Sequence, residues 1–382
     1  MKKVLMNASV ASMIYKFNMN NIDILETLGY QVDVACNFGK ENPMNCEEVE
    51  KFKKILIDRG IKIIETNCPR SPFAFGKMMS TYKCLKKLAD TGTYEFVHTQ
   101  SPIGGALCRL AFHKARKKGT RVIYTAHGFH FYKGAPLKNW LLYYSIEKIC
   151  SYLTDVLITI NQEDYALAKK KMRAKRIEYV PGVGIDLEKY SGHKYDKMAV
   201  RHEWAIPKGA LVLVSVGELN TNKNHEVIIR ALKRINLGNA LYFICGTGEY
   251  EEELKRLVHN LGLDDKVRFL GYRTDIDKIL CSADIFCFPS KREGLGLAAI
   301  EAMTSGLPIL TSNVHGIKDY SVNGISGYSY SPMDVEGFAE GIMKLAKDET
   351  LRNVMGERNK KAVITYSLKN INFLMEKIYR EI

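Results

Sequence analysis

The chain has 382 residues, of which 46% are hydrophobic and only 10 are proline, enough apolar sequence for two domains with substantial cores. Its formal net charge is +14, and no apolar run reaches the roughly 18 residues that a transmembrane helix requires. The nine cysteines are scattered and never form a C-x-x-C pair, which argues against a disulfide framework or a zinc site and indicates a reducing cytosolic setting.

Short apolar strands alternate with amphipathic helices along the chain. In the first half we predict strands over residues 4–8, 32–36, 61–65, 96–99, 122–125 and 156–160. In the second half we predict strands over residues 211–216, 241–245, 267–270, 285–288 and 308–311. Alternation of this kind is typical of parallel sheets, so we predict an α/β chain of two doubly wound, Rossmann-like domains with ligands at the carboxyl ends of the strands.

Positive charge is concentrated in the first half. Residues 51–150 hold 19 basic and 5 acidic side chains, whereas residues 201–382 are nearly balanced, with 24 basic and 23 acidic. A predicted helix over 77–90 places Lys83, Lys86 and Lys87 opposite its apolar face, which suits an anionic membrane surface or a lipid-diphosphate acceptor. The alternative is that these lysines complement helix dipoles and aid solubility.

Two other features have ordinary explanations. The basic run 169–176 follows a predicted helix over 163–168, and we interpret it as a solvated helix end. The high pI of about 9.2 raises nucleic acid as a partner, but the sequence has no helix-turn-helix signature, RNP-like strand or Cys/His finger, so we expect no nucleic-acid binding.

One glycine-rich turn resembles a dinucleotide site only in part. Cys245-Gly246-Thr247-Gly248 follows a predicted strand and opens a helix, but Glu251 stands at the third glycine of the G-x-G-x-x-G pattern. An NAD site is therefore not expected, and these glycines are more consistent with a tight turn.

The most informative segment runs from residue 284 to residue 308. It is predicted to form a buried strand, a turn over 293–296 and a helix over 297–304, which ends at Ser305-Gly306-Leu307-Pro308. Gly294 and Gly296 lack a Cβ, so a diphosphate can approach the N–H groups of the first helical turn, including that of Leu297. Leu295 lies between them in the same loop.

Two glutamates flank this turn. Side chains on a helix lean toward its N-terminus, so Glu301 is expected to point back toward the mouth that Glu293 borders. An ionised carboxylate accepts hydrogen bonds from two hydroxyls, so Glu301 can hold a ribose diol and Glu293 the sugar hydroxyls. Two glutamates eight residues apart also occur by chance in an ordinary strand-turn-helix unit.

The stretch through Pro308 resembles the E-x7-E motif of the retaining glycosyltransferases of family 4. The resemblance extends over nearly the full chain. It includes residues 4–37, Thr125-Ala126-His127-Gly128, the turn from Val180 to Asp186, and the strand and loop 214–224. The chain is most similar to the bacterial capsule and exopolysaccharide members.

This resemblance implies the GT-B fold, in which two domains face a central cleft. It implies an acceptor-side domain over 1–190, a donor-binding domain over 191–365, and a terminal helix over about 366–382 that packs back onto the first domain. It also implies transfer of a sugar from a nucleoside diphosphate, UDP by analogy, to a lipid-linked glycan at the inner face of the cell membrane. The sugar that is transferred is expected to be a hexosyl or N-acetylhexosaminyl group.

Several site residues are implied by the resemblance alone. Lys223 matches the lysine that neutralises the leaving diphosphate, whereas Glu218 stands where the family has arginine, and Asn222 is expected to donate a neutral hydrogen bond nearby. His127 matches the histidine that contacts the donor sugar, with a structural histidine as the alternative. The remaining expected contacts are Gly246 in the donor cleft, Tyr272 and Arg273 at the base, and Ser12 at the donor or acceptor.

The expected catalytic residues are thus His127, Lys223 and Glu293. No H-x-x-x-H arrangement points to a metal site, and family 4 enzymes generally act without a metal, so we expect no cofactor and no metal. The altered arginine position leaves a second function open, namely a sugar-nucleotide epimerase or a catalytically weak nucleotide-sugar-binding protein of the same fold.

Overall fold

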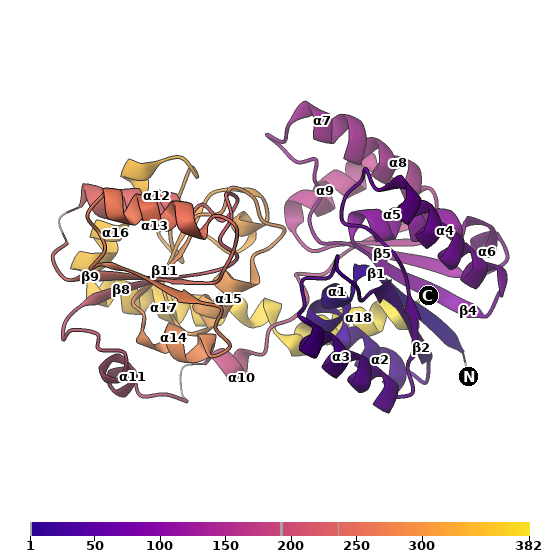
Figure 1. Ribbon diagram of the computed structural model, residues 1–382, viewed down its shortest axis with the longest axis horizontal. Coiled ribbons are helices and arrows are strands. Elements are labelled where there is room, and N and C mark those ends of the chain that lie inside the picture. The colour runs from indigo at the N-terminus through magenta and orange to yellow at the C-terminus, as the bar shows by residue number, and fades with distance from the viewer. Residues whose placement is uncertain (1, 192–193, 236) are drawn as a thin grey trace. The chain divides into compact units, whose positions relative to one another are not determined.

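A computed structural model describes residues 2–191, 194–235 and 237–382 (Figure 1). It contains two compact units, one of Met1–Val183 with Lys369–Ile382 and the other of Gly184–Leu368. The first division lies seven residues before the expected limit of 190. Residues 184–190 belong to the second unit, because Gly184 packs on Leu368 and the helix α10 (Leu187–Tyr190) contacts the helix α15 (Leu297–Thr304).

The first unit is built on a parallel sheet of seven strands in the order β3-β2-β1-β4-β5-β6-β7. Its strands are β1 (Lys3–Val10), β2 (Gln31–Asn37), β3 (Lys62–Glu65), β4 (Tyr94–Gln100), β5 (Arg121–Ala126), β6 (Val156–Thr159) and β7 (Arg176–Tyr179). Because the central strands are buried on both faces, they are nearly continuous apolar runs, as β1 illustrates with seven buried residues of eight.

Helices cover both faces of this sheet. They are α1 (Ala11–Phe17), α2 (Met19–Thr27), α3 (Cys46–Asp58), α4 (Phe75–Asp90), α5 (Pro102–Ala111), α6 (His113–Lys117), α7 (Leu137–Asn139), a π-helix (Trp140–Tyr144), α8 (Ser145–Ser151), α9 (Gln162–Lys171) and α18 (Leu368–Arg380). In Figure 1, α1, α2, α3 and α18 lie on one side of β1, and α4, α5 and α8 lie on the other.

The C-terminal helix α18 is tied to the first sheet by a buried histidine. His98 on β4 forms hydrogen bonds with the Tyr379 hydroxyl and with Thr125 Oγ1, each over 2.8 Å. Burial lowers the pKa of His98 to about 3, so this imidazole is neutral at physiological pH. The terminal helix therefore completes the core of the first unit, although it follows the second unit in sequence.

The second unit repeats the same design with six parallel strands in the order β10-β9-β8-β11-β12-β13. Its strands are β8 (Leu211–Val216), β9 (Ala240–Cys245), β10 (Val267–Gly271), β11 (Ile285–Phe288), β12 (Ile309–Ser312) and β13 (Gly327–Tyr330). Its further helices are α11 (Lys197–Glu203), α12 (His225–Arg234), α13 (Glu251–Asn260), α14 (Ile276–Ser282), α16 (Val335–Lys347) and α17 (Glu349–Ala362), with 3-10 turns at His315–Asp319 and Val363–Tyr366.

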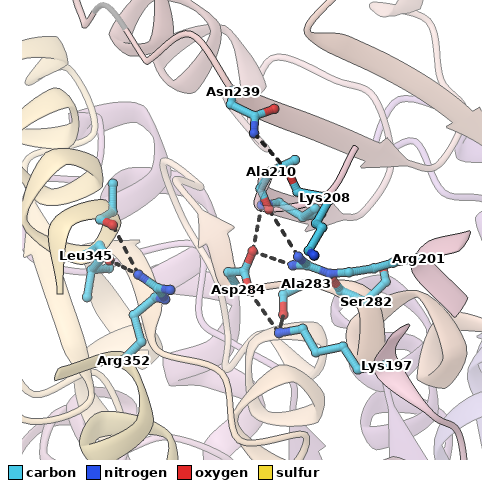
Figure 2. Close-up of polar contacts among 12 residues, drawn as sticks. Lys197, Arg201, Lys208, Ala210, Asn239, Ser282, Ala283, Asp284, Leu345 and Arg352 are labelled. Carbon is cyan, nitrogen blue, oxygen red and sulfur yellow. Dashed lines mark hydrogen bonds and ion pairs between the residues drawn. The ribbon is translucent and has the colours of Figure 1, made fainter. Parts of the chain in front are cut away.

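A mostly buried carboxylate fixes the start of β11 in this unit (Figure 2). Asp284 accepts hydrogen bonds from Lys197 Nζ (2.8 Å), an Arg201 guanidinium N–H (2.5 Å) and the Val212 N–H (2.8 Å). Burial opposes ionisation of this carboxyl, but Lys197, the Val212 N–H and Arg201 outweigh that effect and lower its pKa. Arg201 also donates to the carbonyl of Ala210, so α11 is attached to the residues just before β8 and β11, the two central strands.

The structure confirms the two doubly wound parallel sheets and every predicted strand within a few residues. It adds β7 and β13, which the sequence did not predict, at the edges of the two sheets. The predicted basic helix is confirmed as α4. Of the basic run 169–176, Lys169–Lys171 form the end of α9 as predicted, but residues 172–175 follow the helix and Arg176 begins β7. Within the described ranges, no helix has both the length and the apolar character needed to cross a bilayer.

Candidate nucleotide-sugar site

The strand order of the second sheet reverses between β8 and β11, so the loops that follow these neighbouring strands lie side by side at their carboxyl ends. Lys223 is in the first loop and Glu293 in the second. Lys223 Nζ donates to Glu293 Oε1 over 2.5 Å, and both side chains are mostly buried, at 20% and 14% exposure. Lys223 Nζ also lies 4.9 Å from the ring centroid of Phe288, the last residue of β11.

Asparagines hold these two loops together. Asn220 Oδ1 accepts hydrogen bonds from the N–H groups of Asn222 and Lys223, over 3.1 and 3.0 Å. Asn222 Nδ2 donates to the carbonyl of Arg292 over 3.0 Å, and the Lys291 N–H donates to the carbonyl of Asn222 over 2.7 Å. Asn222 therefore links the loops, and this link positions Lys223 opposite Glu293.

The turn before α15 depends on Gly296. This residue has φ +90° and stands at the N-cap of the helix, where no side chain caps the first turn. A Cβ on Gly296 would lie 2.5 Å from Phe288 Cε1 and 2.9 Å from the Tyr320 hydroxyl. The first N–H groups of a helix have no partner within it and attract anions, so the Gly294–Leu297 segment presents a backbone site suited to a phosphate.

Glu301 lies one turn into α15 and has a partner from a distant part of the second unit. The Tyr190 hydroxyl at the end of α10 interacts with its carboxylate. Burial raises the pKa of Glu301, and this effect outweighs the opposing influence of Tyr190 and Lys189. The carboxylate is therefore held in a partly desolvated position, where a hydrogen bond to a ligand hydroxyl is stronger than at the surface.

The three remaining candidates of this unit lie at the ends of β9 and β10. Gly246 has φ +143°, and a Cβ there would lie 1.9 Å from the carbonyl oxygen of Gly217, so this glycine allows the loop before Lys223 to approach. Tyr272 is 67% exposed. Arg273 forms two hydrogen bonds with Asp275, over 2.8 and 2.5 Å, and lies over the ring of Trp204.

In the first unit, His127 follows β5 and is bound by a glutamine. Its Nε2 lies 2.5 Å from Gln100 Oε1, and the Gln100 amide in turn donates to Asn18. Burial lowers the pKa of His127 to about 4, so the imidazole is neutral and donates its Nε2 proton to the Gln100 oxygen. A cavity of about 20 Å³ adjoins His127 and Gln100, with room for about one water molecule.

Ser12 is buried in α1, and its N–H donates to Asn42 Oδ1 over 3.0 Å.

In the second unit, the structure brings Lys223, Glu293, Asn222 and the Gly294–Leu297 turn together, with Gly246 behind them. Sequence reasoning missed Tyr190, which no pattern in the sequence indicates. It also missed Gln100, which the parallel register places beside Thr125 near His127.

Comparison with known proteins agrees with this geometry. Residues 22–189 match the family model described as Glycosyltransferase Family 4, and residues 196–362 match the model described as Glycosyl transferases group 1. The chain is 33% identical over 370 residues to EpsD of Bacillus subtilis, which is assigned as a glycosyltransferase, and the match covers 96% of this chain and 93% of that protein. The chain belongs to glycosyltransferase family 4.

Two further relatives bear on this family 4 chain. It is 30% identical over 365 residues to the UDP-Gal:alpha-D-GlcNAc-diphosphoundecaprenol alpha-1,3-galactosyltransferase of Escherichia coli, covering 91% of this chain and 88% of that protein. The solved structure of HepE from Anabaena in complex with UDP has a TM-score of 0.79 at 18% identity, covering all of both chains. That likeness shows the GT-B fold.

Family membership makes this chain a nucleotide-sugar-dependent glycosyltransferase. The roles of the individual side chains stay predictions, because the family assignment does not test them. Among the described residues, no group of three or more His, Cys, Asp and Glu side chains is arranged to hold a metal ion.

Proposed function

We propose that this glycosyltransferase moves a sugar from a UDP-sugar to a lipid-linked glycan, with retention of configuration, in the synthesis of a cell-surface polysaccharide. The two relatives that match nearly the whole chain support the acceptor class, since one is named for a diphosphoundecaprenol-linked substrate. The UDP complex of the full-length structural neighbour supports the donor nucleotide.

The observation that carries this proposal is the pair of Lys223 and Glu293 across the switch point of the second sheet. A diphosphate bound at the N-terminus of α15 competes with Glu293 for the Lys223 ammonium. Lys223 then neutralises the leaving β-phosphate, and Glu293 is released to accept hydrogen bonds from sugar hydroxyls. In this scheme Glu301 holds the ribose.

Retention follows from a front-face reaction that needs no carboxylate nucleophile. The bond from the anomeric carbon to the β-phosphate oxygen breaks, and the acceptor oxygen bonds to that carbon on the same face. The departing phosphate oxygen takes the acceptor proton. Lys223 and the first amides of α15 stabilise the charge that develops on the phosphate, so we propose that the reaction requires no metal.

One observation favours a second function. Glu218 occupies the position where the family has arginine, and it is exposed and accepts a hydrogen bond from Asn220 Nδ2 over 3.1 Å. Without that second cation the site stabilises a leaving diphosphate less strongly, which is consistent with an epimerase or a weak nucleotide-sugar-binding protein. Transfer depends on an added acceptor, whereas epimerisation does not.

For the location of the enzyme, we propose the inner face of the cell membrane with peripheral attachment. The excess positive charge of residues 51–150 supports this, because each basic side chain near an anionic surface contributes about 1 kcal/mol. In liposome sedimentation, binding to anionic vesicles should be strong at low salt and lost at high salt. Equal sedimentation with zwitterionic vesicles would contradict it.

The chemistry is tested by supplying UDP-sugars and a lipid-linked glycan and following UDP release and product configuration. We expect release only with acceptor, an α-linked product from an α-donor, and full activity in EDTA. A β-linked product would contradict retention, and loss of activity in EDTA with rescue by Mg²⁺ or Mn²⁺ would contradict metal independence. Sugar conversion without acceptor would favour the epimerase.

A further inference from the structure

The first unit contains an apolar groove of about 380 Å³, a volume typical of small-molecule sites. Four separate segments line it: the loop into α4, the helix α5, the loop after β5, and the π-helix with α8. Ile103 and Ala106 of α5 form part of it, facing Phe131 from the β5 loop and Ile146 from α8. All of these segments belong to the same compact unit.

The carboxylate of Glu147, which is part of this lining, is paired with a buried cation. Glu147 accepts a hydrogen bond from the buried Arg109 guanidinium over 2.8 Å and another from the Tyr124 hydroxyl over 2.9 Å. The interior therefore presents hydrocarbon and aromatic surface without an unpaired charge at Glu147, so it suits an apolar ligand.

The rim of the groove differs from the interior. Phe73 and Phe75 are 79% and 70% exposed at one edge, although aromatic side chains of this size are usually buried. Arg70 lies in the loop into α4, Lys133 in the loop after β5 and Lys138 in α7, directly before the π-helix, and all three are exposed. Exposed apolar groups mixed with cations are typical of a surface that meets an anionic lipid interface.

The groove also adjoins His127 and Gln100 in the first unit. Its lining residue Gly128 directly follows His127, and its lining residues Pro102 and Ile103 begin the helix just after Gln100. His127 and Gln100 are hydrogen-bonded to each other at the carboxyl ends of β5 and β4. The groove therefore reaches the carboxyl edge of the first sheet, where ligands bind in doubly wound folds.

We propose that this groove binds the first isoprenoid units of the lipid-linked diphosphate acceptor, with the diphosphate at the cationic rim. This inference rests on the proposed function, because it assigns a place to the lipid of that acceptor. The expected ligand is a hydrocarbon chain that carries an anion, because the interior of the groove is apolar and the charged side chains of the surrounding segments are mainly basic.

The test uses farnesyl diphosphate as a water-soluble probe that needs no membrane. The chain has two tryptophans, and the ring of Trp140 lies 5.6 Å from that of Phe131 in the groove wall. In a Trp204→Phe background, Trp140 emission therefore reports on the groove. We expect saturable binding of farnesyl diphosphate and at least tenfold weaker binding of inorganic diphosphate.

Two variants alter the groove differently. Ile146→Glu introduces a charge into the lining, and Ala106→Phe fills the interior, so each should weaken farnesyl diphosphate binding on the order of tenfold or more. Ile149→Glu is the matched control, because Ile149 is 62% exposed on the same helix but outside the groove lining. Its affinity for the probe should stay within about twofold of the parent.

The proposal is overturned if inorganic diphosphate binds as tightly as farnesyl diphosphate, or if both groove variants retain the parent affinity. It is also overturned if farnesyl diphosphate leaves Trp140 emission unchanged while Ile146→Glu abolishes self-association in sedimentation, since the groove is then an interface between copies. Calorimetric titration with UDP, which should be unaffected by all three variants, separates a failure of the groove from a failure of the donor site.

Discussion

Replacing Gly296 with alanine should disrupt the turn that starts α15. Two effects add. A left-handed backbone costs an L-residue about 1–2 kcal/mol, and the new Cβ would lie 2.5 Å from Phe288 Cε1 and 2.9 Å from the Tyr320 hydroxyl, which adds about 1–3 kcal/mol of overpacking. The free energy of unfolding of the second unit should therefore fall by about 2–5 kcal/mol.

Gly262→Ala separates these two contributions. Gly262 has φ +63°, and no heavy atom lies within 4 Å of the place that an alanine Cβ would take, so alanine there carries the backbone cost alone, about 1–2 kcal/mol. Both substitutions should be made in a Trp140→Phe background, where Trp204 reports urea unfolding of the second unit. We expect Gly296→Ala to be the more destabilising by about 1–3 kcal/mol.

The same pair of variants tests the link to ligand binding. Movement of the turn displaces the first N–H groups of α15, so Gly296→Ala should weaken UDP binding at least tenfold, whereas Gly262→Ala should leave it unchanged. Equal destabilisation by the two substitutions would refute the close approach to Phe288. Unchanged UDP affinity in Gly296→Ala would refute the assignment of the diphosphate to this helix terminus.

Three further predictions concern titratable groups. The pKa of Asp284 is lowered in the folded protein, so its ionised form stabilises the fold above about pH 4. Asp284→Asn should therefore lower the free energy of unfolding by about 3 kcal/mol or more at pH 7. In urea unfolding, the difference in stability between parent and variant should shrink as the pH falls below about 4. Gln100→Glu should raise the pKa of His127 from about 4, so that NMR detects imidazole protonation above pH 5, whereas an unmoved titration would contradict the contact. The raised pKa of Glu301 predicts that UDP binding weakens as the pH falls. Tyr190 lowers that pKa, so Tyr190→Phe should move this loss to higher pH in calorimetry, and identical profiles would contradict the interaction of Tyr190 with Glu301.

Local patterns allowed much of the fold to be predicted. The segment 284–308 was predicted within one residue at each boundary, because its buried strand, its glycine turn and its C-terminal Gly306 signal are all encoded in consecutive residues. The edge strand β7 was missed because Arg176 and Glu178 interrupt its apolar pattern and only Ile177 is buried. The edge strand β13 begins with a glycine, a residue depleted in strands.

Contacts between distant residues explain what was not predicted in the site. The partner of Glu301 is Tyr190, more than one hundred residues earlier, and no periodicity links them. The apolar groove is assembled from four separate segments, so no single stretch indicates it, although Phe73 and Phe75 beside a basic helix were a partial signal. The pairing of Lys223 with Glu293 depends on the neighbouring positions of β8 and β11, which only the sheet order establishes.

The most direct test of the account is acceptor-dependent UDP release by Lys223→Gln. Lys255→Gln is the matched control, because Lys255 also pairs with a glutamate, Glu251 at 2.8 Å, but on the exposed surface of α13. If Lys223 stabilises the leaving diphosphate, kcat should fall by about 10²–10³ in Lys223→Gln and stay within about twofold of the parent in Lys255→Gln. Turnover by a folded Lys223→Gln at the parental rate would contradict the proposed donor site.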